Sequence, residues 1–306
     1  MKRPRQNFDT KEDDSKTKND NVAFFKPHPS GEVRRGLQII NKMKNYTSFA
    51  FLLIVAGLIS GMVSEKKRPV KVFLAGDSTC ANYELEDDYQ SKRFPLTGWG
   101  QVFQQYFRKD SLKEVSGLIK VDSVVVDDRA KGGRSTRTFF QEGRWRAIYS
   151  ELQPGDLVII SFGHNDAAKD KTERYVDIDG YKEFLRLYVS QTRQKGGIPV
   201  LMTPVNRNYP WEEGVLKSCH GEYPQAVKDI AAEMNVLLID LTQLSCEHFT
   251  KMGQDFVSEK YFMNLPAKTY TAYPDGQKDN THFQPAGANA VAQLVFDGLK
   301  KLEIKN

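Results

Sequence analysis

The motif Gly76-Asp77-Ser78-Thr79 could supply a nucleophile, and it directly follows the apolar run Val70–Leu74. β-Branched and aromatic residues dominate the run, which predicts a buried strand. Gly76 permits a sharp turn at its end. Ser78 then falls where we expect a helix to begin, and free N–H groups there favour nearby negative charge. This environment suits acyl transfer by an exposed serine hydroxyl. The alternative is that Asp77, Ser78 and Thr79 only cap a helix.

Three further motifs follow predicted strands or precede the last predicted helix. They are Gly132-Gly133-Arg134-Ser135, Gly163-His164-Asn165-Asp166 and Asp279-Asn280-Thr281-His282. Ligands of an open parallel sheet bind beyond the carboxyl ends of its strands, so we expect all four motifs at one edge. Each has a simpler interpretation by itself: a turn at Gly132-Gly133, a loop amide at Asn165, a helix residue at His282. Their order and placement together favour one acyl-transfer site.

The residue types in these motifs suit distinct catalytic roles. Ser78 is inert at neutral pH until a base removes its proton, and a histidine with an ordinary pKa of about 6.5 suits that task. Asp279 lies three residues before His282 and could accept a hydrogen bond from its Nδ1–H. This mechanism requires no metal or other cofactor, and the sequence offers no clustered metal ligands.

Strands and helices are predicted to alternate in the body of the chain, which implies an α/β fold with one parallel sheet covered by helices on both faces. The strands are expected at Val70–Ala75, Lys120–Asp127, Leu157–Phe162, Pro199–Thr203 and Val236–Leu241, and the helices at Gln101–Phe107, Phe139–Leu152, Tyr181–Lys195, Tyr223–Met234 and Ala286–Leu302. Four long connections, residues 81–95, 167–180, 205–221 and 249–277, are expected to carry function.

The segment before this body is expected to be separate from it. Residues 1–42 are polar and charged, which predicts disorder. A basic start at Met43-Lys44, an apolar run from Phe49 to Val63 and small residues after it are typical of a secretory signal peptide over residues 43–64. Met43 could then be the true start of translation. An uncleaved signal anchor is the alternative. We therefore expect export to the periplasm or the exterior, with membrane attachment only through this segment.

Composition limits the other function classes. The chain has 306 residues, 40% of them hydrophobic, enough for one sizeable core. Its net charge of +5 is concentrated before residue 70, so the body shows no footprint for nucleic acid. The scattered cysteines have no metal-binding spacing, and a disulfide between Cys219 and Cys246 is compatible with an oxidising compartment.

The four motifs resemble those of the GDSL-type, or SGNH, hydrolase superfamily, whose sequence blocks supply Ser, Gly, Asn and His in that order. Several segments further resemble its rhamnogalacturonan acetylesterase group: Leu74–Thr79, Thr97–Gly100, Gly133–Ser135, Glu142–Trp145 and His282–Gly287. The resemblance covers about residues 70–303. It implies a flavodoxin-like three-layer sandwich around a five-stranded parallel sheet.

This resemblance implies Ser78 as nucleophile, His282 as base and Asp279 as the acid that orients it. It implies an oxyanion hole from the backbone N–H groups of Ser78 and Gly133 and the side chain of Asn165. The implied activity is that of a serine esterase removing O-acetyl groups from a plant cell-wall polysaccharide, with rhamnogalacturonan, a pectin, as the expected substrate. The alternatives are an esterase acting on acetyl-xylan or another ester, and a catalytically silent carbohydrate-binding protein. The long connection 249–277 departs from the family pattern.

Aromatic and basic residues near the same edge are predicted to bind substrate. The long connections carry aromatic residues that would suit stacking on sugar rings, or would only anchor loops: Tyr209, Trp211, Tyr261, Tyr270 and Tyr273. Arg134 and Arg137 follow the expected oxyanion glycine, and a planar guanidinium can bond both oxygens of a uronate carboxylate. The alternative for Arg134 and Arg137 is pairing with a protein carboxylate.

Overall fold

The structure is a computed structural model that describes residues 68–304. The expected disordered extension (residues 1–42) and signal segment (residues 43–64) lie outside the described residues. Between residues 68 and 304, the helices are all too short or too polar to cross a membrane.

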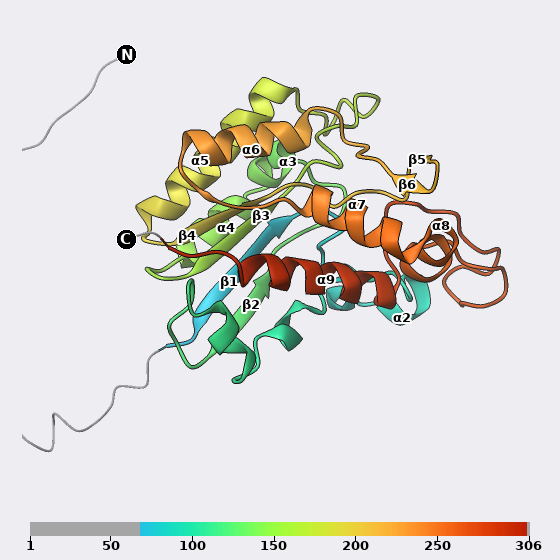
Figure 1. Ribbon diagram of the computed structural model, residues 1–306, viewed down its shortest axis with the longest axis horizontal. Helices are drawn as coiled ribbons and strands as arrows, with labels where there is room; N and C mark the ends of the chain where they lie inside the picture. Colours follow the sequence, from blue (N-terminus) through green and yellow to red (C-terminus); the bar gives the residue numbers. More distant parts are fainter. Residues whose placement is uncertain (1–67, 305–306) are drawn as a thin grey trace, which may run out of the picture. The chain divides into compact units, whose positions relative to one another are not determined.

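Five parallel strands form the central sheet in the order β2-β1-β3-β4-β7 (Figure 1). They are β1 (Val70–Gly76), β2 (Val124–Asp128), β3 (Leu157–Ser161), β4 (Ile198–Met202) and β7 (Leu237–Ile239). β1 lies at the centre, where Val72 pairs with Val126 on one side and with Leu157 on the other. The chain therefore leaves β1 toward β2 and returns on the opposite side at β3. Such a reversal opens a crevice at the carboxyl ends of the two strands, which is where ligands of this fold class bind.

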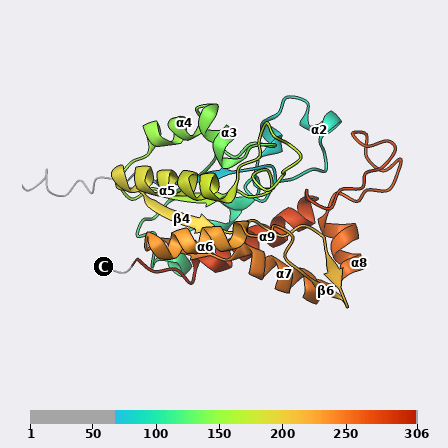
Figure 2. The ribbon, with the colours of Figure 1, turned by 90° about the horizontal axis from the view of Figure 1, so that it is seen from above.

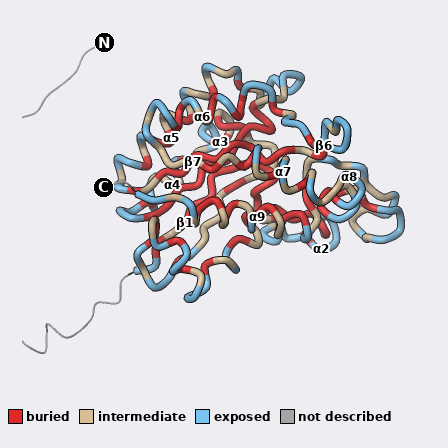
Figure 3. The backbone as a smooth tube through the Cα atoms, viewed as in Figure 1, coloured by how far each residue is buried: buried red, intermediate tan, exposed pale blue. Residues whose placement is uncertain are grey.

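Two apolar clusters cover the two faces of the sheet. Alternate residues of β1 point into them, with Val72 and Leu74 in one and Phe73 and Ala75 in the other. The first cluster includes side chains of α7 (Leu241–Met252), α9 (Pro285–Leu299) and the 3₁₀ helix η2 (Phe103–Tyr106). The second includes side chains of α3 (Thr136–Gln141), α4 (Arg144–Glu151), α5 (Ile178–Gln194) and α6 (Tyr223–Glu233). Figure 3 shows β1 as a mostly buried segment between these layers.

The longest helix illustrates how the sequence pattern sets this packing. α5 begins after Asp177, whose side chain accepts a hydrogen bond from the Gly180 amide at 2.8 Å. Its buried residues follow helical spacing along one face, namely Tyr181, Leu185, Tyr188, Val189 and Thr192. α5 and α6 lie side by side in both Figure 1 and Figure 2. Fully burying each large apolar side chain stabilises such a layer by about 1.5–3 kcal/mol.

The predicted α/β fold with a five-stranded parallel sheet is confirmed, but several element bounds differ. The helix predicted over residues 139–152 is two helices, α3 and α4, because Gly143 between them has a left-handed φ of 73°. Residues 103–106 form the 3₁₀ helix η2 in place of the predicted α-helix. β2 begins only at Val124, four residues later than expected.

The long connections contain more regular structure than the sequence pattern indicated. Residues 81–95 hold the 3₁₀ helix η1 (Tyr83–Leu85) and α2 (Tyr89–Lys92), and residues 205–221 hold a hairpin of β5 (Trp211–Glu212) and β6 (Val215–Leu216). The connection 249–277 includes the end of α7, α8 (Gln254–Phe256) and a π-helical turn, η4 (Val257–Tyr261).

Candidate active site

Ser78 lies in a single hydrogen-bonded turn directly after β1, and not at the start of an α-helix as predicted. The amides of residues 80 and 81 both donate to the carbonyl of Asp77, at 3.2 and 3.1 Å. The turn does not continue as a helix because the carbonyls of Thr79-Cys80 accept hydrogen bonds from the amides of Trp99-Gly100, at 3.0 and 2.9 Å. The Tyr83 hydroxyl also donates to the Ser78 carbonyl at 2.8 Å. The turn that carries Ser78 is thus held from several sides.

The side chains of Ser78, His282 and Asp279 form a continuous hydrogen-bonded chain. Ser78 Oγ lies 2.9 Å from His282 Nε2, and His282 Nδ1 lies 2.7 Å from Asp279 Oδ2. Burial acts to raise the pKa of Asp279, but the hydrogen bonds and charge of His282 outweigh it, so the pKa lies below its usual value. The carboxylate is therefore ionised at neutral pH and holds the histidine proton on Nδ1. The His282 side chain is 29% exposed, which leaves the serine-facing nitrogen open to a substrate.

The connection 249–277 positions the hydrogen-bonded side chains of Ser78, His282 and Asp279. Met263 donates its amide to the His282 carbonyl at 2.9 Å, and Asn264 Oδ1 accepts from the Asp279 amide at 3.0 Å. Phe283, the residue after His282, is fully buried and bridges to both Thr97 and Phe262. The connection therefore has a structural task at the site, apart from any contact with substrate.

The loops after β2 and β3 are joined to each other beside Ser78. Gly133 has a left-handed φ of 78°, which favours glycine, and a Cβ on Gly132 would stand 3.7 Å from Ser78 Cβ. Asn165 Nδ2 donates to the Arg134 carbonyl at 2.9 Å. An amide NH₂ has two N–H groups, and this contact uses one of them. The second could meet an oxyanion, so the role predicted for Asn165 fits its position.

Asp166 also joins the loop after β3 to the start of α3, which follows the Gly132-Gly133 loop. Its Oδ1 accepts from the amide and hydroxyl of Thr136, at 2.9 and 2.6 Å. Burial raises the pKa of Asp166 to about 7 although these hydrogen bonds oppose it. The first residue of α3 and the loop after β3 are thereby tied together, which keeps the Gly133 and Asn165 donors in fixed relation.

A second Asp–His pair, missed by the sequence analysis, lies next to the turn that carries Ser78. Asp77 Oδ2 is 3.2 Å from His164 Nδ1, and both side chains are buried. Burial acts to raise the Asp77 pKa, but the charge and hydrogen bond of His164, with those of Thr79, lower it to about 2. The available signal was position, because His164 directly precedes Asn165 and Asp77 directly precedes Ser78. The pair links the turn after β1 to the loop after β3.

The two arginines predicted to bind substrate have partners within the protein. Arg134 Nε donates to Glu142 at 3.0 Å, which is the alternative that the sequence left open. Arg137 donates to the carbonyls of Thr172 and Tyr175, at 3.1 and 3.2 Å, and not to a carboxylate. Both guanidinium groups therefore hold loops in this structure.

The aromatic residues of the long connections divide into two groups. Tyr261 is buried and stacks on His248, so it is a loop anchor. Tyr209 is exposed, and Trp211 is half-buried with its Nε1 donating to Asn208 at 3.0 Å. Asn208 in turn donates its amide to the Asn280 carbonyl at 2.9 Å, beside Asp279. Substrate binding by Trp211 stays a prediction that its position next to the site allows.

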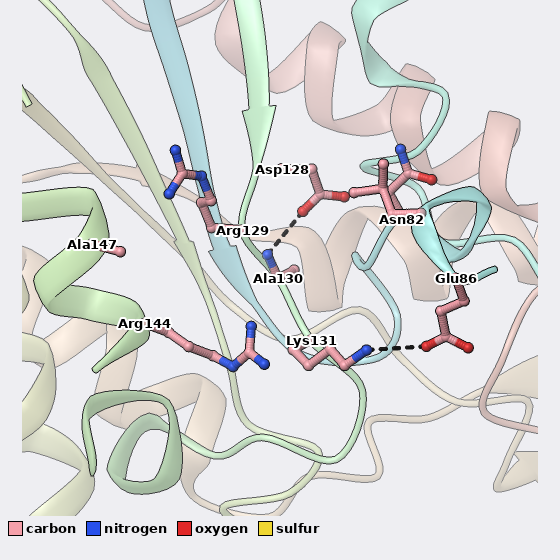
Figure 4. A pocket seen from close by; sticks show the side chains of 9 residues that line it. Asn82, Glu86, Asp128, Arg129, Ala130, Lys131, Arg144 and Ala147 are labelled. Atoms are coloured by element: carbon pink, nitrogen blue, oxygen red, sulfur yellow. Dashed lines mark hydrogen bonds and ion pairs between the residues drawn. The ribbon is translucent and has the colours of Figure 1, made fainter. Parts of the chain in front are cut away.

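A cavity of about 260 Å³ lies next to the Gly132-Gly133 loop but contains none of the Ser78, His282 or Asp279 side chains (Figure 4). Figure 4 shows Lys131 paired with Glu86 across it, at 3.1 Å. Asp128 also lines this cavity, and burial raises its pKa to about 8. Lys131 and Glu86 therefore neutralise each other, and the raised pKa favours the uncharged form of Asp128 at neutral pH. The cavity supports the loop and is not the centre of reaction.

Two remaining expectations concern metals and thiols. Residues 68–304 contain no group of three or more His, Cys, Asp or Glu side chains placed to hold a metal ion. Cys219 and Cys246, between which a disulfide was allowed, are both free thiols.

Comparison with known proteins places this geometry in a family. The GDSL-like lipase/acylhydrolase family model matches residues 74–290. The rhamnogalacturonan acetylesterase RhgT of Bacillus subtilis is 38% identical over 236 residues, which cover 77% of this chain and 92% of RhgT. The crystal structure of YxiM from Bacillus subtilis superposes with a TM-score of 0.61 at 28% identity, over 76% of this chain and 57% of that chain.

A more distant structure shares the fold alone. The acetylxylan esterase Axe2 of Geobacillus stearothermophilus has a TM-score of 0.50 at 18% identity, over 78% of this chain and 97% of that chain. The family match spans most of the described residues and includes both ends of the Ser78–His282–Asp279 chain. The chain therefore belongs to the GDSL-like lipase/acylhydrolase family, and it is a carboxylic ester hydrolase.

Proposed function

We propose that this protein is a serine esterase that removes O-acetyl groups from an acetylated plant cell-wall polysaccharide, with rhamnogalacturonan as its preferred substrate. The observation that carries the proposal is the chain of short contacts from Ser78 Oγ through His282 to Asp279. The substrate is supported by the similarity to RhgT, which extends over 92% of that acetylesterase.

The geometry suits acyl transfer in two steps. Ser78 Oγ attacks the acetyl carbonyl carbon while His282 Nε2 takes the hydroxyl proton, and Asp279 stabilises the imidazolium that forms. The carbonyl oxygen becomes an oxyanion, to which the backbone N–H groups of Ser78 and Gly133 and the Asn165 amide donate. His282 then returns the proton to the leaving sugar oxygen, and the acetyl group stays on Ser78. Water then attacks the acetyl carbonyl carbon while His282 takes one of its protons, and His282 returns this proton to Ser78 Oγ as the acyl–Oγ bond breaks and the acetate product leaves.

Acetate release by the full chain from defined substrates tests the proposal. We expect a higher kcat/KM on acetylated rhamnogalacturonan than on acetyl-xylan, and no activity on either with Ser78→Ala. Near-normal turnover by Ser78→Ala would refute the nucleophile. A preference for acetyl-xylan in the unchanged protein would refute the substrate and leave the esterase chemistry in place.

We also propose that residues 43–64 direct export of the enzyme, since a polymeric cell-wall substrate lies outside the cell. Support comes from the basic start and apolar run of this segment. Mass spectrometry of the mature protein tests it. A chain beginning after about residue 64 would support cleavage and export, whereas one beginning before residue 43 would refute a cleaved signal peptide.

A further inference from the structure

The guanidinium group of Arg174 lies against the glycine that is proposed to supply an oxyanion donor. A Cβ on Gly133 would stand 3.6 Å from Arg174 Nη1. The nearest carboxylate oxygen, on exposed Glu173, is 4.0 Å from Arg174 Nε, which is too far for a hydrogen bond. Arg174 Nε is itself buried and has no hydrogen-bond partner among residues 68–304. The Arg174 side chain is 31% exposed, so its terminal Nη groups, and not the buried Nε, are available to an anion from outside the chain.

A second arginine contacts the other loop of the oxyanion site. Arg207 Nη2 lies 3.4 Å from the carbonyl of His164, the residue before Asn165, and Nη1 donates to the Tyr209 hydroxyl at 2.6 Å. Its Nε is buried without a partner in the described part of the chain. The Tyr209 ring beside it, 5.8 Å from the guanidinium carbon, is 41% exposed. Positive charge and an exposed ring thus stand together next to the proposed oxyanion donors.

The arginines that the sequence had pointed to explain how Arg174 is held. Arg137 donates to the carbonyls of Thr172 and Tyr175, which flank Arg174 in the chain. Arg137 therefore fixes the loop that carries Arg174. The ion pair of Arg134 with Glu142 leaves that guanidinium engaged. Of the four, Arg174 and Arg207 are those whose Nε is buried without a partner among residues 68–304.

We propose that Arg174 and Arg207 form a binding subsite for a carboxylate of the substrate, namely that of a uronate ring near the acetylated sugar. The inference rests on the function proposed above and defines its substrate class as acetylated oligosaccharides that contain uronic acid. A guanidinium suits this task because its planar fork can donate to both carboxylate oxygens. The exposed face of Tyr209 is placed to contact a sugar ring at the same time.

The test compares two forms of one acetylated oligosaccharide, with free uronate carboxylates or with these carboxylates methyl-esterified. Full-chain variants Arg174→Ala, Arg174→Lys and Arg207→Ala are assayed for acetate release, together with hydrolysis of p-nitrophenyl acetate. Arg193→Ala is the matched control. Arg193 also donates to two backbone carbonyls, those of Met234 and Asn235, but it lies in the last turn of α5, near the amino end of β4 and away from the site.

We expect each alanine variant to raise KM for the free-carboxylate substrate about tenfold, as loss of one charged hydrogen-bonding partner would. KM for the methyl-esterified substrate should rise much less, so the ratio of kcat/KM on the free-carboxylate substrate to kcat/KM on the methyl-esterified substrate should fall, and Arg193→Ala should leave this ratio unchanged. Arg174→Lys should give an intermediate KM because it keeps the charge but loses the fork. Added salt should reduce the difference in KM between the free-carboxylate and the methyl-esterified substrate.

Two outcomes would overturn the subsite in distinguishable ways. If the arginine variants lose kcat/KM equally on the free and methyl-esterified substrates, or lose it on neither, the arginines do not bind the carboxylate. The esterase function would still stand. If the unchanged protein hydrolyses p-nitrophenyl acetate but neither oligosaccharide, the proposed substrate class fails, and the subsite fails with it.

Discussion

Replacing Asp279 by asparagine turns one carboxylate oxygen into an NH₂ group at nearly constant size. Oδ1 accepts hydrogen bonds from the amides of Thr281 and His282, at 2.7 and 3.0 Å, so an NH₂ group in that place would face two N–H donors. The amide oxygen must therefore stay at Oδ1, and the NH₂ group takes the Oδ2 position, 2.7 Å from His282 Nδ1. His282 then accepts at Nδ1 and carries its proton on Nε2, where it cannot receive the proton of Ser78.

The size of the effect follows from the donors that must be left unpaired. To act as a base, His282 in the variant has to carry its proton on Nδ1, opposite the NH₂ group. Two unpaired donors on these half-buried side chains cost about 1–3 kcal/mol each, or about 2–6 kcal/mol together. Since about 1.36 kcal/mol corresponds to tenfold in rate, kcat should fall by about 30-fold to about 3 × 10⁴-fold. Loss of the negative charge beside the imidazolium acts in the same direction and favours the upper part of this range.

Two measurements on Asp279→Asn test this reasoning. Turnover of p-nitrophenyl acetate gives the loss in kcat, and ¹⁵N NMR of the histidine ring shows which nitrogen of His282 carries the proton. The control is Asp275→Asn, an exposed aspartate four residues before Asp279, which should leave both unchanged. A variant within tenfold of normal kcat, or one that is slow but still protonated on Nδ1, would refute the tautomer argument.

Three further perturbations follow from the same structure. Ser78→Ala should abolish ester hydrolysis while leaving the melting temperature near normal, because the lost hydroxyl opens no core cavity; residual turnover on p-nitrophenyl acetate would contradict this. Asn165→Ala should lower kcat by about 10²–10³ with little change in KM, since an oxyanion donor acts in the transition state; a raised KM at constant kcat would indicate substrate binding. The pKa of Asp166 is raised from 3.8 to about 7 in the folded protein, so its stabilising contribution is complete below pH 3.8 and is lost as the pH rises through 7. Asp166→Asn should remove that pH dependence, on the order of 4 kcal/mol between pH 4 and 8 in urea unfolding; identical pH profiles would disprove it.

Local sequence was enough to predict the elements whose signal is local. The apolar run of β1 is buried on both faces, as a central parallel strand requires, and its bounds differ from the prediction by one residue. The helix start expected at Ser78 was wrong because the carbonyls of Thr79-Cys80 pair with Trp99-Gly100, which lie about twenty residues further along the chain. A contact at that distance has no signature in the motif itself.

Residue type and spacing predicted which side chains meet at the centre of the site better than they predicted its surroundings. Ser78, His282 and Asp279 have few alternative uses when they meet at one sheet edge, and the structure places them in hydrogen-bond contact. An arginine, by contrast, binds any nearby oxygen. Whether Arg137 faces a substrate or the carbonyls of Thr172 and Tyr175 depends on how the loop after β3 folds back, which the sequence pattern does not encode.

The two Asp–His pairs around Ser78 show why burial must be known before a role is assigned. Both pairs have a carboxylate oxygen near Nδ1, at 3.2 Å for Asp77–His164 and 2.7 Å for Asp279–His282. The His164 side chain is only 3% exposed, and its Nε2 is sealed in the protein without a described partner, so it has no path to a substrate proton. His282 is 29% exposed and its Nε2 faces Ser78 Oγ. The same two residue types therefore hold the backbone together in the buried pair and are placed to move a proton in the open one.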